Sequence, residues 1–451
     1  MNVDILIKNG TVFTPSGVLR CNIAVGDGKI VSLVSDSNSP NADRIIDCKG
    51  KLVIPGIIDA HVHFRDPGYT HKEDYETGSR AAAAGGVTMV MDQPNVDPVP
   101  NTAERFEAHM ENAGKKSIID FNHFASPGNL EEVPKLAALG TIAFKIFQKK
   151  AAYPYDTEAS IADDLEIFEA FEAVGKTNRM CSVHAHETAI YEGKLQRLRD
   201  TGEMTWQKFI DVSYSELVRV GSVPTLIYLA EKASVRYYAL HCGLKDYIDV
   251  IRTAKRAGKN IVADCVISHL VPSPKGDTPE ILKGQYKTHE KHVQATWQGI
   301  MDGTIDFIDS DHAPHLPEEI EAGVKEPEKM ALGYGCMEYW FSLLLNEANK
   351  GRITIEQLVK LCSSNVAKIF DIYPRKGALQ VGSDADITIV DPKKKMTITC
   401  DNLHTKAGWT AYEGYEVTGV PIFTIVRGSI VMEDGDVVGK PGTGKFIRPN
   451  L

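Results

Sequence analysis

The sequence predicts an α/β protein in which a (β/α)8 (TIM) barrel is flanked by a β-sandwich formed by both chain ends. Three observations lead to this prediction. The chain has 451 residues, which suits a large barrel plus a smaller module better than one ordinary core. Between roughly residues 52 and 376, strand-like runs alternate with helix-like segments. Short strand-like runs bounded by glycine-containing turns occupy both ends of the chain.

Both chain ends contain short strand-like runs. Strand-like runs lie at residues 4–8, 22–25 and 29–33 near the N-terminus, and at 385–390, 423–428 and 430–432 near the C-terminus. We therefore expect residues 1–52 and 377–451 to pair as two parts of one sandwich. Residues 53–376 are expected to form a metal-dependent barrel between them.

The middle of the chain contains eight strand-like runs. They are residues 52–63, 87–92, 117–124, 141–147, 180–186, 235–241, 260–269 and 305–311. Helix-like segments between them include 75–84, 161–174, 226–232 and 247–257. The segment 272–285 is predicted to be a loop over the barrel mouth, and 317–328 a partly helical, mobile stretch. Eight strands in this alternation predict a closed parallel barrel.

Composition excludes several classes of protein. Hydrophobic residues make up 43% of the chain and charged residues 24%, typical of a globular protein, and the net charge of -10 disfavours nucleic-acid binding. We find no apolar stretch long enough to span a membrane and no basic, apolar leader. The eight cysteines include no C-x-x-C pair, and Cys181, Cys242 and Cys265 lie in apolar runs. These features predict a cytoplasmic protein with reduced cysteines.

The first strand-like run ends in two histidines, His61 and His63. Residues i and i+2 of a strand point to the same face, so the two imidazoles leave the strand end side by side. Two neutral imidazoles held in this way form half of a metal site. The alternative is a strand that carries two histidines satisfied by ordinary hydrogen bonds. The turn Asp66-Pro67-Gly68 after a buried strand favours the metal interpretation.

Polar side chains also follow the other predicted strands, at the barrel end that carries functional residues. They are Asp92 and Asn95 after the second strand, Lys145 in the fourth, His184 and His186 in the fifth, His241 in the sixth, His269 in the seventh, and Asp311, His312 and His315 after the eighth. At least four histidines, a lysine and an aspartate are therefore expected to converge on one mouth.

Lys145 stands between Phe144 and Ile146, where a buried cation would be costly. One interpretation is a lysine that snorkels to the rim. The other is a lysine of lowered pKa that reacts with CO2 to give a carbamate, which converts a cation into an anionic bridge between two metal ions. The surrounding histidines favour the bridge.

Asp311 has two interpretations as well. A carboxylate at the rim can ligate a metal and also take a proton from an attacking water. The alternative is an N-cap for the helix that follows the strand. The neighbouring histidines favour the catalytic interpretation.

Three other patterns carry less weight. Geometry alone allows either His184 or His186 to be a ligand, because the two share one face of the fifth strand. His289 and His292 would share a helix face and either bind metal or be solvated. Residues 439–446 resemble a phosphate-binding loop, but Phe446 stands where Ser or Thr should bind magnesium, which indicates a terminal loop.

In combination, several motifs resemble the cyclic amidohydrolases, namely the dihydroorotases, allantoinases and hydantoinases of the amidohydrolase superfamily. The motifs are His61-Val62-His63-Phe64-Arg65-Asp66-Pro67-Gly68, residues 76–88, Phe144-Lys145-Ile146-Phe147, Ser310-Asp311-His312-Ala313-Pro314-His315, residues 382–386 and Val426-Arg427-Gly428. The resemblance covers nearly the whole chain and implies a distorted TIM barrel with a flanking β-sandwich. It also implies a homo-oligomer, a dimer or a tetramer.

For the site, the resemblance implies two zinc ions bridged by carbamylated Lys145. The implied metal ligands are His61, His63, Lys145, His184, His241 and Asp311, with Asp311 also catalytic. The family usually has His-Ala-Glu or His-Cys-Glu after the fifth strand, so its ligand matches His184, and His186 occupies an unusual position. Among the branches, dihydroorotase is nearest, because Arg65, Asn95 and His315 match the residues that hold its substrate carboxylate. A guanidinium fork and two further donors suit a carboxylate.

Three segments depart from the family pattern: 266–270 after the seventh strand, 285–290, and 332–336. Their divergence bears on the substrate more than on the reaction type. The resulting prediction is a zinc-dependent hydrolase of a ring C–N amide or imide bond, dihydroorotase-like, acting on a carboxylate-bearing cyclic ureide. The alternatives are a hydantoinase (dihydropyrimidinase) or allantoinase, and a scaffold relative without catalysis. A scaffold should have lost metal ligands, whereas all six are present.

Overall fold

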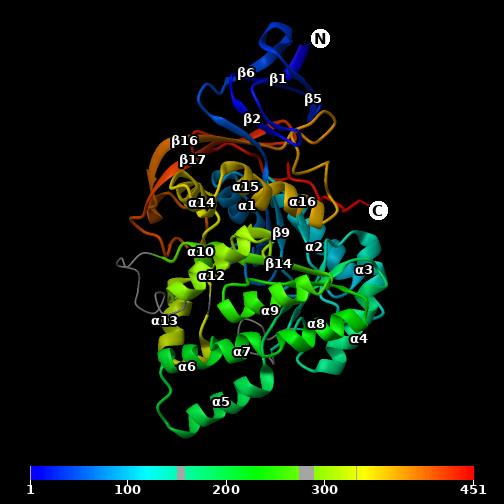
Figure 1. The fold of residues 1–451 in the computed structure, drawn as a ribbon, viewed down its shortest axis with the longest axis vertical. Coiled ribbons are helices and arrows are strands. Elements are labelled where there is room, and N and C mark those ends of the chain that lie inside the picture. Colours follow the sequence, from blue (N-terminus) through cyan, green and yellow to red (C-terminus); the bar gives the residue numbers. More distant parts are fainter. Residues whose placement is uncertain (1, 150–157, 274–288, 332, 451) are drawn as a thin grey trace.

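The structure is a computed structural model, and it describes residues 2–149, 158–273, 289–331 and 333–450. Strands from both chain ends gather at one end of the molecule, and helices α5 and α6 lie at the opposite end (Figure 1). The barrel occupies the middle. Within the described ranges, no helix combines the length and apolar character that crossing a bilayer requires.

Eight parallel strands form the barrel. They are β8 (Ile57–Val62), β9 (Val87–Asp92), β10 (Asp120–His123), β11 (Phe144–Phe147), β12 (Met180–His184), β13 (Arg236–Ala239), β14 (Ile261–Val266) and β15 (Phe307–Asp309). Their hydrogen-bonded order is β10-β9-β8 in one sheet and β11-β12-β13-β14-β15 in the other. Parallel bridges from Ala125 to Phe144 and from Val62 to His312 join the two sheets into a ring. The ring brings the carboxyl ends of all eight strands to one mouth.

The predicted strand 52–63 is wrong as a single element. It divides at Gly56 into β7 (Leu52–Pro55), which pairs with β16 of the sandwich, and β8 of the barrel. A Cβ at Gly56 would lie 2.2 Å from Thr88 Oγ1, so only glycine fits where the chain passes between the two units. The predicted strand 260–269 ends early at Val266, and His269 lies on the short helix α10 (Ile267–Leu270).

Helices surround the barrel. They are α1 (Tyr75–Ala84), α2 (Ala103–Lys116), α3 (Val133–Leu139), α4 (Asp164–Gly175), α5 (Thr188–Asp200), α6 (Trp206–Ser213), α7 (Glu216–Val220), α8 (Val223–Lys232), α9 (Lys245–Arg256), α10, α12 (Glu290–Met301), α13 (Pro317–Lys325), α14 (Trp340–Asn349), α15 (Ile355–Val359) and α16 (Asn365–Ile369). The described chain also contains the short 3-10 helices η1 (Asp36–Asn38), η2 (Pro327–Lys329) and η4 (Cys400–Asn402) and the π-helix η3 (Lys360–Ser364). Helix α1 has the predicted bounds because Asp74 caps it, accepting from the Thr77 backbone N–H at 2.8 Å.

The sandwich combines strands from both chain ends, as predicted. Its strands are β1 (Asn2–Lys8), β2 (Thr11–Thr14), β3 (Gly17–Leu19), β4 (Asn22–Gly26), β5 (Lys29–Val34), β6 (Asn41–Asp47), β7, β16 (Ile387–Thr397), β17 (Glu416–Val426), β18 (Ser429–Glu433) and β19 (Asp436–Val437). One sheet has the order β5-β4-β1-β6 and the other β19-β18-β17-β16-β7-β2-β3. Ile5, Ile23, Val53, Ile387 and Ile425 are buried together between them. Neither end could bury this apolar face alone.

A buried charge cluster joins the sandwich to the barrel. The Lys376 ammonium is 1% exposed and donates to Asp120 of β10 and to Asp386, and it lies 3.1 Å from Asp384. Burial alone would lower the pKa of Lys376, but these carboxylates hold it above its usual range. Arg427 Nε also donates to Asp120, at 3.0 Å. The Lys376 cation therefore connects the barrel to the sandwich through buried ion pairs.

The C-terminal segment packs along the barrel. The Gly444 N–H donates to the Ser117 carbonyl at 2.9 Å, and Phe446 bridges to Phe121. This packing agrees with the interpretation of residues 439–446 as a terminal loop.

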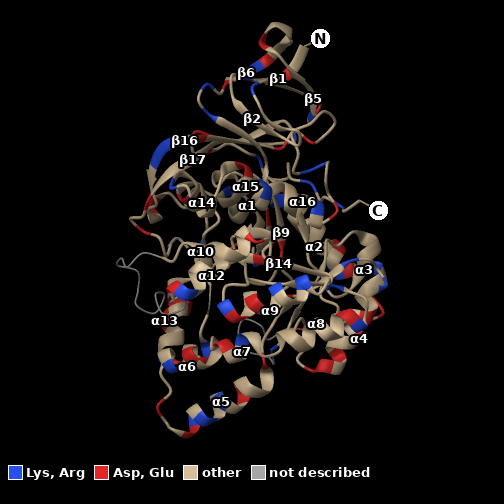
Figure 2. Cartoon of the chain, viewed as in Figure 1, with Lys and Arg blue, Asp and Glu red and all other residues tan. Residues whose placement is uncertain are grey.

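Basic and acidic residues are interspersed along the outer helices of the described chain in the view of Figure 2. The net charge of -10 is therefore distributed rather than gathered on one visible face.

Candidate metal centre

A polar cavity opens at the carboxyl ends of the barrel strands. Its lining residues are His61, His63, Arg65, Asn95, Lys145, Phe147, His184, Tyr214, Arg219, His241, Val266, His269, Asp311, Ala313 and Gly333. All six residues of the predicted metal set are among them. Of the predicted substrate residues, Arg65 and Asn95 line the cavity, and His315 lies behind Arg65.

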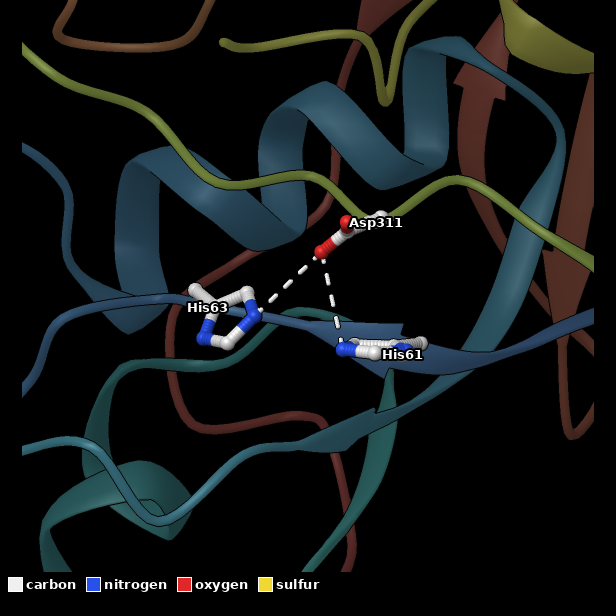
Figure 3. A group of neighbouring side chains, drawn as sticks. All are labelled: His61, His63 and Asp311. Atoms are coloured by element: carbon white, nitrogen blue, oxygen red, sulfur yellow. Dashed lines mark ion pairs between the residues drawn. The ribbon is translucent and has the colours of Figure 1, made fainter. Parts of the chain in front are cut away.

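His61, His63 and Asp311 all line this cavity, and Figure 3 shows both histidines facing Asp311. Asp311 Oδ1 lies 3.5 Å from His61 Nε2 and 3.3 Å from His63 Nε2. One ligand atom of each residue falls within 4.8 Å of the others, so the group could hold a metal ion. Asp311 adopts a left-handed backbone with φ 52°, which a non-glycine residue rarely does without tertiary support.

The protonation states suit metal binding. Burial lowers the pKa of His63 to about 3, so its imidazole is neutral at physiological pH. Burial alone would raise the pKa of Asp311, but His61 and His63 hold it well below its usual range. A neutral histidine and an ionised carboxylate are the forms that bind a cation.

Second-layer contacts orient both histidines. His63 Nδ1 lies 2.5 Å from Asn95 Oδ1, and His61 Nδ1 lies 3.6 Å from Asp264 Oδ2. Each ring therefore turns its Nε2 toward Asp311. Such partners fix the tautomer and the ring plane of metal-binding histidines. Asn95 thus has a role beside the one predicted for it, and Asp264 was not predicted at all.

Three buried carboxylates stand behind these histidines. Tyr238 Oη donates to Asp264 at 2.6 Å and to Asp309 at 3.3 Å. Asp59 accepts from the Ser310 backbone N–H at 3.3 Å. Burial raises the pKa of Asp59 to about 7 and that of Asp309 well above its usual range. The network ties β8, β13, β14 and β15 together beneath the site.

Lys145 points into the cavity from β11 and is fully buried. Its Nζ donates to Gln93 Oε1 at 3.1 Å and lies 4.8 Å from the Phe147 ring centroid. Burial lowers the pKa of Lys145 to about 7. A substantial fraction of its amine is therefore neutral at physiological pH, the form that reacts with CO2.

His184 and His241 form a second histidine pair in the cavity. His184 Nδ1 lies 3.0 Å from His241 Nε2. The guanidinium of Arg219, on α7, reaches both rings: Nη1 lies 2.7 Å from His184 Nε2 and Nη2 lies 3.1 Å from His241 Nδ1. Sequence reasoning missed Arg219 because no motif surrounds it. The sequence predicted His184 and His241 as metal ligands and predicted no arginine in contact with them.

The structure separates the alternatives left open for the other histidines. His184 lines the cavity, whereas His186 is buried with its ring 4.6 Å from that of Tyr191. His292 accepts from the Lys245 backbone N–H at 3.0 Å, away from the cavity lining. His269 does line the cavity. Of the divergent segments, residues 285–288 and Leu332 lie outside the described residues, as does most of the predicted loop 272–285.

Arg65 lines one part of the cavity, and His315, Lys72 and Glu319 form a polar group behind it. Arg65 Nη2 lies 3.2 Å from His315 Nε2, and Lys72 Nζ lies 3.3 Å from His315 Nδ1. Glu319 of α13 pairs with Lys72 at 2.8 Å and lies 3.6 Å from His315 Nδ1. Lys72 was missed because it follows the histidine motif within a polar run. Arg65, with φ 63°, presents the guanidinium of this group to the cavity.

The amidohydrolase family model matches residues 52–431. A dihydroorotase from Methanosarcina acetivorans is 32% identical over 99% of this chain and 95% of the relative. An L-hydantoinase from Paenarthrobacter aurescens is 30% identical over 98% of each chain. Among solved structures, the L-hydantoinase (dihydropyrimidinase) from Arthrobacter aurescens has a TM-score of 0.90 and 28% identity, covering 99% of this chain and 100% of that one. The dihydropyrimidinase from Brevibacillus agri NCHU1002 has a TM-score of 0.90 and 25% identity, with 98% of each covered.

Proposed function

The chain belongs to the amidohydrolase family and is a cyclic amidohydrolase, and from this premise we propose that it opens the ring of a carboxylate-bearing cyclic ureide, as a dihydroorotase does. The observation that supports the substrate class is the Arg65 guanidinium in the cavity wall. A buried guanidinium that faces a cavity is suited to bind a carboxylate bidentately.

We propose that two zinc ions bind in the cavity. His61, His63 and Asp311 fit one ion through their convergent ligand atoms and their protonation states. His184 and His241 would hold the second, and Lys145, as a carbamate, would bridge the two. Carbamate formation joins the neutral Lys145 nitrogen to the CO2 carbon and releases one proton. Bound metal would supply an activated water and polarise the ring carbonyl.

The protein's own residues then have distinct roles. Asp311 takes the proton of the attacking water and returns it to the ring nitrogen as the C–N bond breaks. Arg65 and Asn95 bind the substrate carboxylate, with His315 supported by Lys72 and Glu319 behind them. Binding a remote carboxylate orients the ring carbonyl toward the metal centre.

A second candidate is a hydantoinase or dihydropyrimidinase, which acts on rings without a carboxylate, and an allantoinase is a related possibility. The 30% identity to an L-hydantoinase favours this class, as do the hydantoinase and dihydropyrimidinase structures with TM-scores of 0.90. The two candidates share the metal chemistry and differ in the use of Arg65. A substrate panel of dihydroorotate, hydantoin, 5-substituted hydantoins, dihydrouracil and allantoin therefore separates them.

Replacing Arg65 with alanine is expected to lower kcat/KM for dihydroorotate by about 10- to 100-fold, since a hydrogen bond to a charged group contributes about 1.5–3 kcal/mol. Turnover of uncharged rings should change far less. The measurement is steady-state ring opening by zinc-loaded enzyme on the panel, with the exposed sandwich residue Arg44 changed to alanine as a control. If the unmodified protein acts only on uncharged rings, the dihydroorotase assignment is wrong, whereas the proposed metal chemistry is not contradicted.

Activation of metal-free protein by zinc and CO2 is expected to accelerate with pH through about 7. The pKa of Lys145 is lowered by burial to about 7, so the reactive neutral amine increases as the pH rises past that value. The rate is measured by recovery of ring opening at fixed dissolved CO2, between pH 6 and 9. A rate that follows the ordinary lysine pKa near 10, or one independent of CO2, would argue against a carbamate at Lys145.

We also propose a cytoplasmic location and a homo-oligomeric state. All eight cysteines are free thiols, five of them fully or almost fully buried in the barrel, which suits a reducing compartment. Light scattering of the purified protein tests the oligomeric state.

A further inference from the structure

We infer that the Arg219 guanidinium and a metal ion compete for the His184–His241 pair, so that the second metal ion binds only after Arg219 has moved away. The inference rests on the proposed metal-dependent function and concerns how its second ion is admitted. It makes Arg219 a positioning residue that controls metal occupancy.

The competition follows from the hydrogen atoms that each group carries. Arginine has only donors, so Arg219 can bond His184 Nε2 and His241 Nδ1 only if both nitrogens accept. Each neutral imidazole then carries its one proton on the other nitrogen, His184 Nδ1 and His241 Nε2. Those two nitrogens face each other at 3.0 Å. With Arg219 in place on both rings, two N–H groups point at one another.

A metal ion held by the same pair needs the opposite arrangement. The facing nitrogens His184 Nδ1 and His241 Nε2 would offer lone pairs to the ion, and their separation of 3.0 Å is close to the roughly 3.3 Å between two nitrogens on one tetrahedral zinc. The ring protons would then lie on His184 Nε2 and His241 Nδ1 and point at the N–H groups of Arg219. Donor would face donor at both contacts.

Charge acts in the same direction. A guanidinium and a divalent cation on the same two rings repel each other strongly in a buried cavity, where water screens them poorly. Arg219 has a route out, because it is only half-buried on the short helix α7 and lies over the Tyr214 ring at 5.4 Å. The group His61, His63 and Asp311 differs, because Asp311 gives it an anionic ligand of its own in addition to the bridge proposed at Lys145. Loading is therefore stepwise, with a tight first ion and a weaker second ion.

The test is metal binding by the full-length protein after chelation. Zinc is titrated calorimetrically at saturating CO2, and bound metal is counted by elemental analysis, for the unmodified protein, Arg219→Met and Arg219→Lys. Methionine removes the charge and the donors, whereas lysine keeps the charge but cannot reach both rings as a fork. Arg197→Met, at an exposed position on α5, is the matched control. Thermal unfolding of each variant verifies folding.

The expected result is a second-ion affinity about tenfold or more higher in Arg219→Met, an intermediate value in Arg219→Lys, and a first-ion affinity unchanged in all variants. Equal second-ion affinity in the unmodified protein and Arg219→Met overturns the competition, and so does loss of the second ion in that variant, which would make Arg219 a support of the site. Neither outcome touches the proposed hydrolysis, which is read separately from ring opening. Failure of every variant to bind any zinc would overturn the proposed metal-dependent function along with the inference.

Discussion

Replacing Asp311 with asparagine is expected to lower kcat for ring opening by about 10²- to 10⁴-fold, the usual contribution of a positioned acid–base group. The asparagine amide has nearly the shape of the carboxylate but cannot take the proton of the attacking water or return it to the ring nitrogen. It also removes the charge that His61 and His63 face at 3.5 and 3.3 Å. Steady-state kinetics on the best substrate of the panel measures the loss.

Two measurements isolate the proton-transfer role of Asp311. Bound zinc is counted in the same preparation, so that loss of metal is distinguished from loss of the base. The exposed residue Asp436, on β19, is changed to asparagine as a control for the substitution itself. An Asp311→Asn protein that keeps its metal and turns over within a few-fold of the unmodified enzyme would contradict the assignment.

Replacing Lys145 with methionine is expected to lower kcat/KM by about 10³-fold or more, since it removes the proposed bridge of a metal pair that supplies several kcal/mol of charge stabilisation. Native mass spectrometry at neutral pH should show the added mass of one CO2 on the unmodified protein and none on the variant. Lys149→Met is the matched control, because Lys149 is also buried and has a pKa lowered by burial to about 8, yet it does not line the cavity.

Stability distinguishes this loss from misfolding. Because the folded pKa of Lys145 is about 7 and the unfolded value is about 10.4, the unfolded metal-free chain binds more protons between these pH values. The stability contributed at this site therefore rises with pH from about 7 to about 10. Methionine should remove that pH dependence without lowering the melting temperature by more than a few degrees, since it exchanges a buried polar group for an apolar one. A collapse of the melting temperature, or unchanged turnover, would contradict this account of Lys145.

Much of the fold follows from local pattern. Apolar runs that alternate with helix-like segments predicted eight barrel strands, and all eight predicted runs contain one. The capping residue Asp74 sets the start of α1, so its bounds were predictable. The ends of strands were less predictable. β7 and β8 meet at Gly56, where Thr88 leaves no room for a side chain. That constraint comes from a residue distant in the sequence.

For the site, the sequence by itself determined which residue types follow each strand, because parallel strands in a closed barrel deliver them to one mouth. His61, His63, Lys145 and Asp311 were accessible in this way. Periodicity could not choose between His184 and His186, since both share a strand face. Only the tertiary structure decided that His184 and Arg219 line the cavity and that Lys72 lies against His315, behind Arg65. Those contacts depend on where α7 and the loop after β8 fold back over the mouth, and no local sequence pattern encodes such long-range packing.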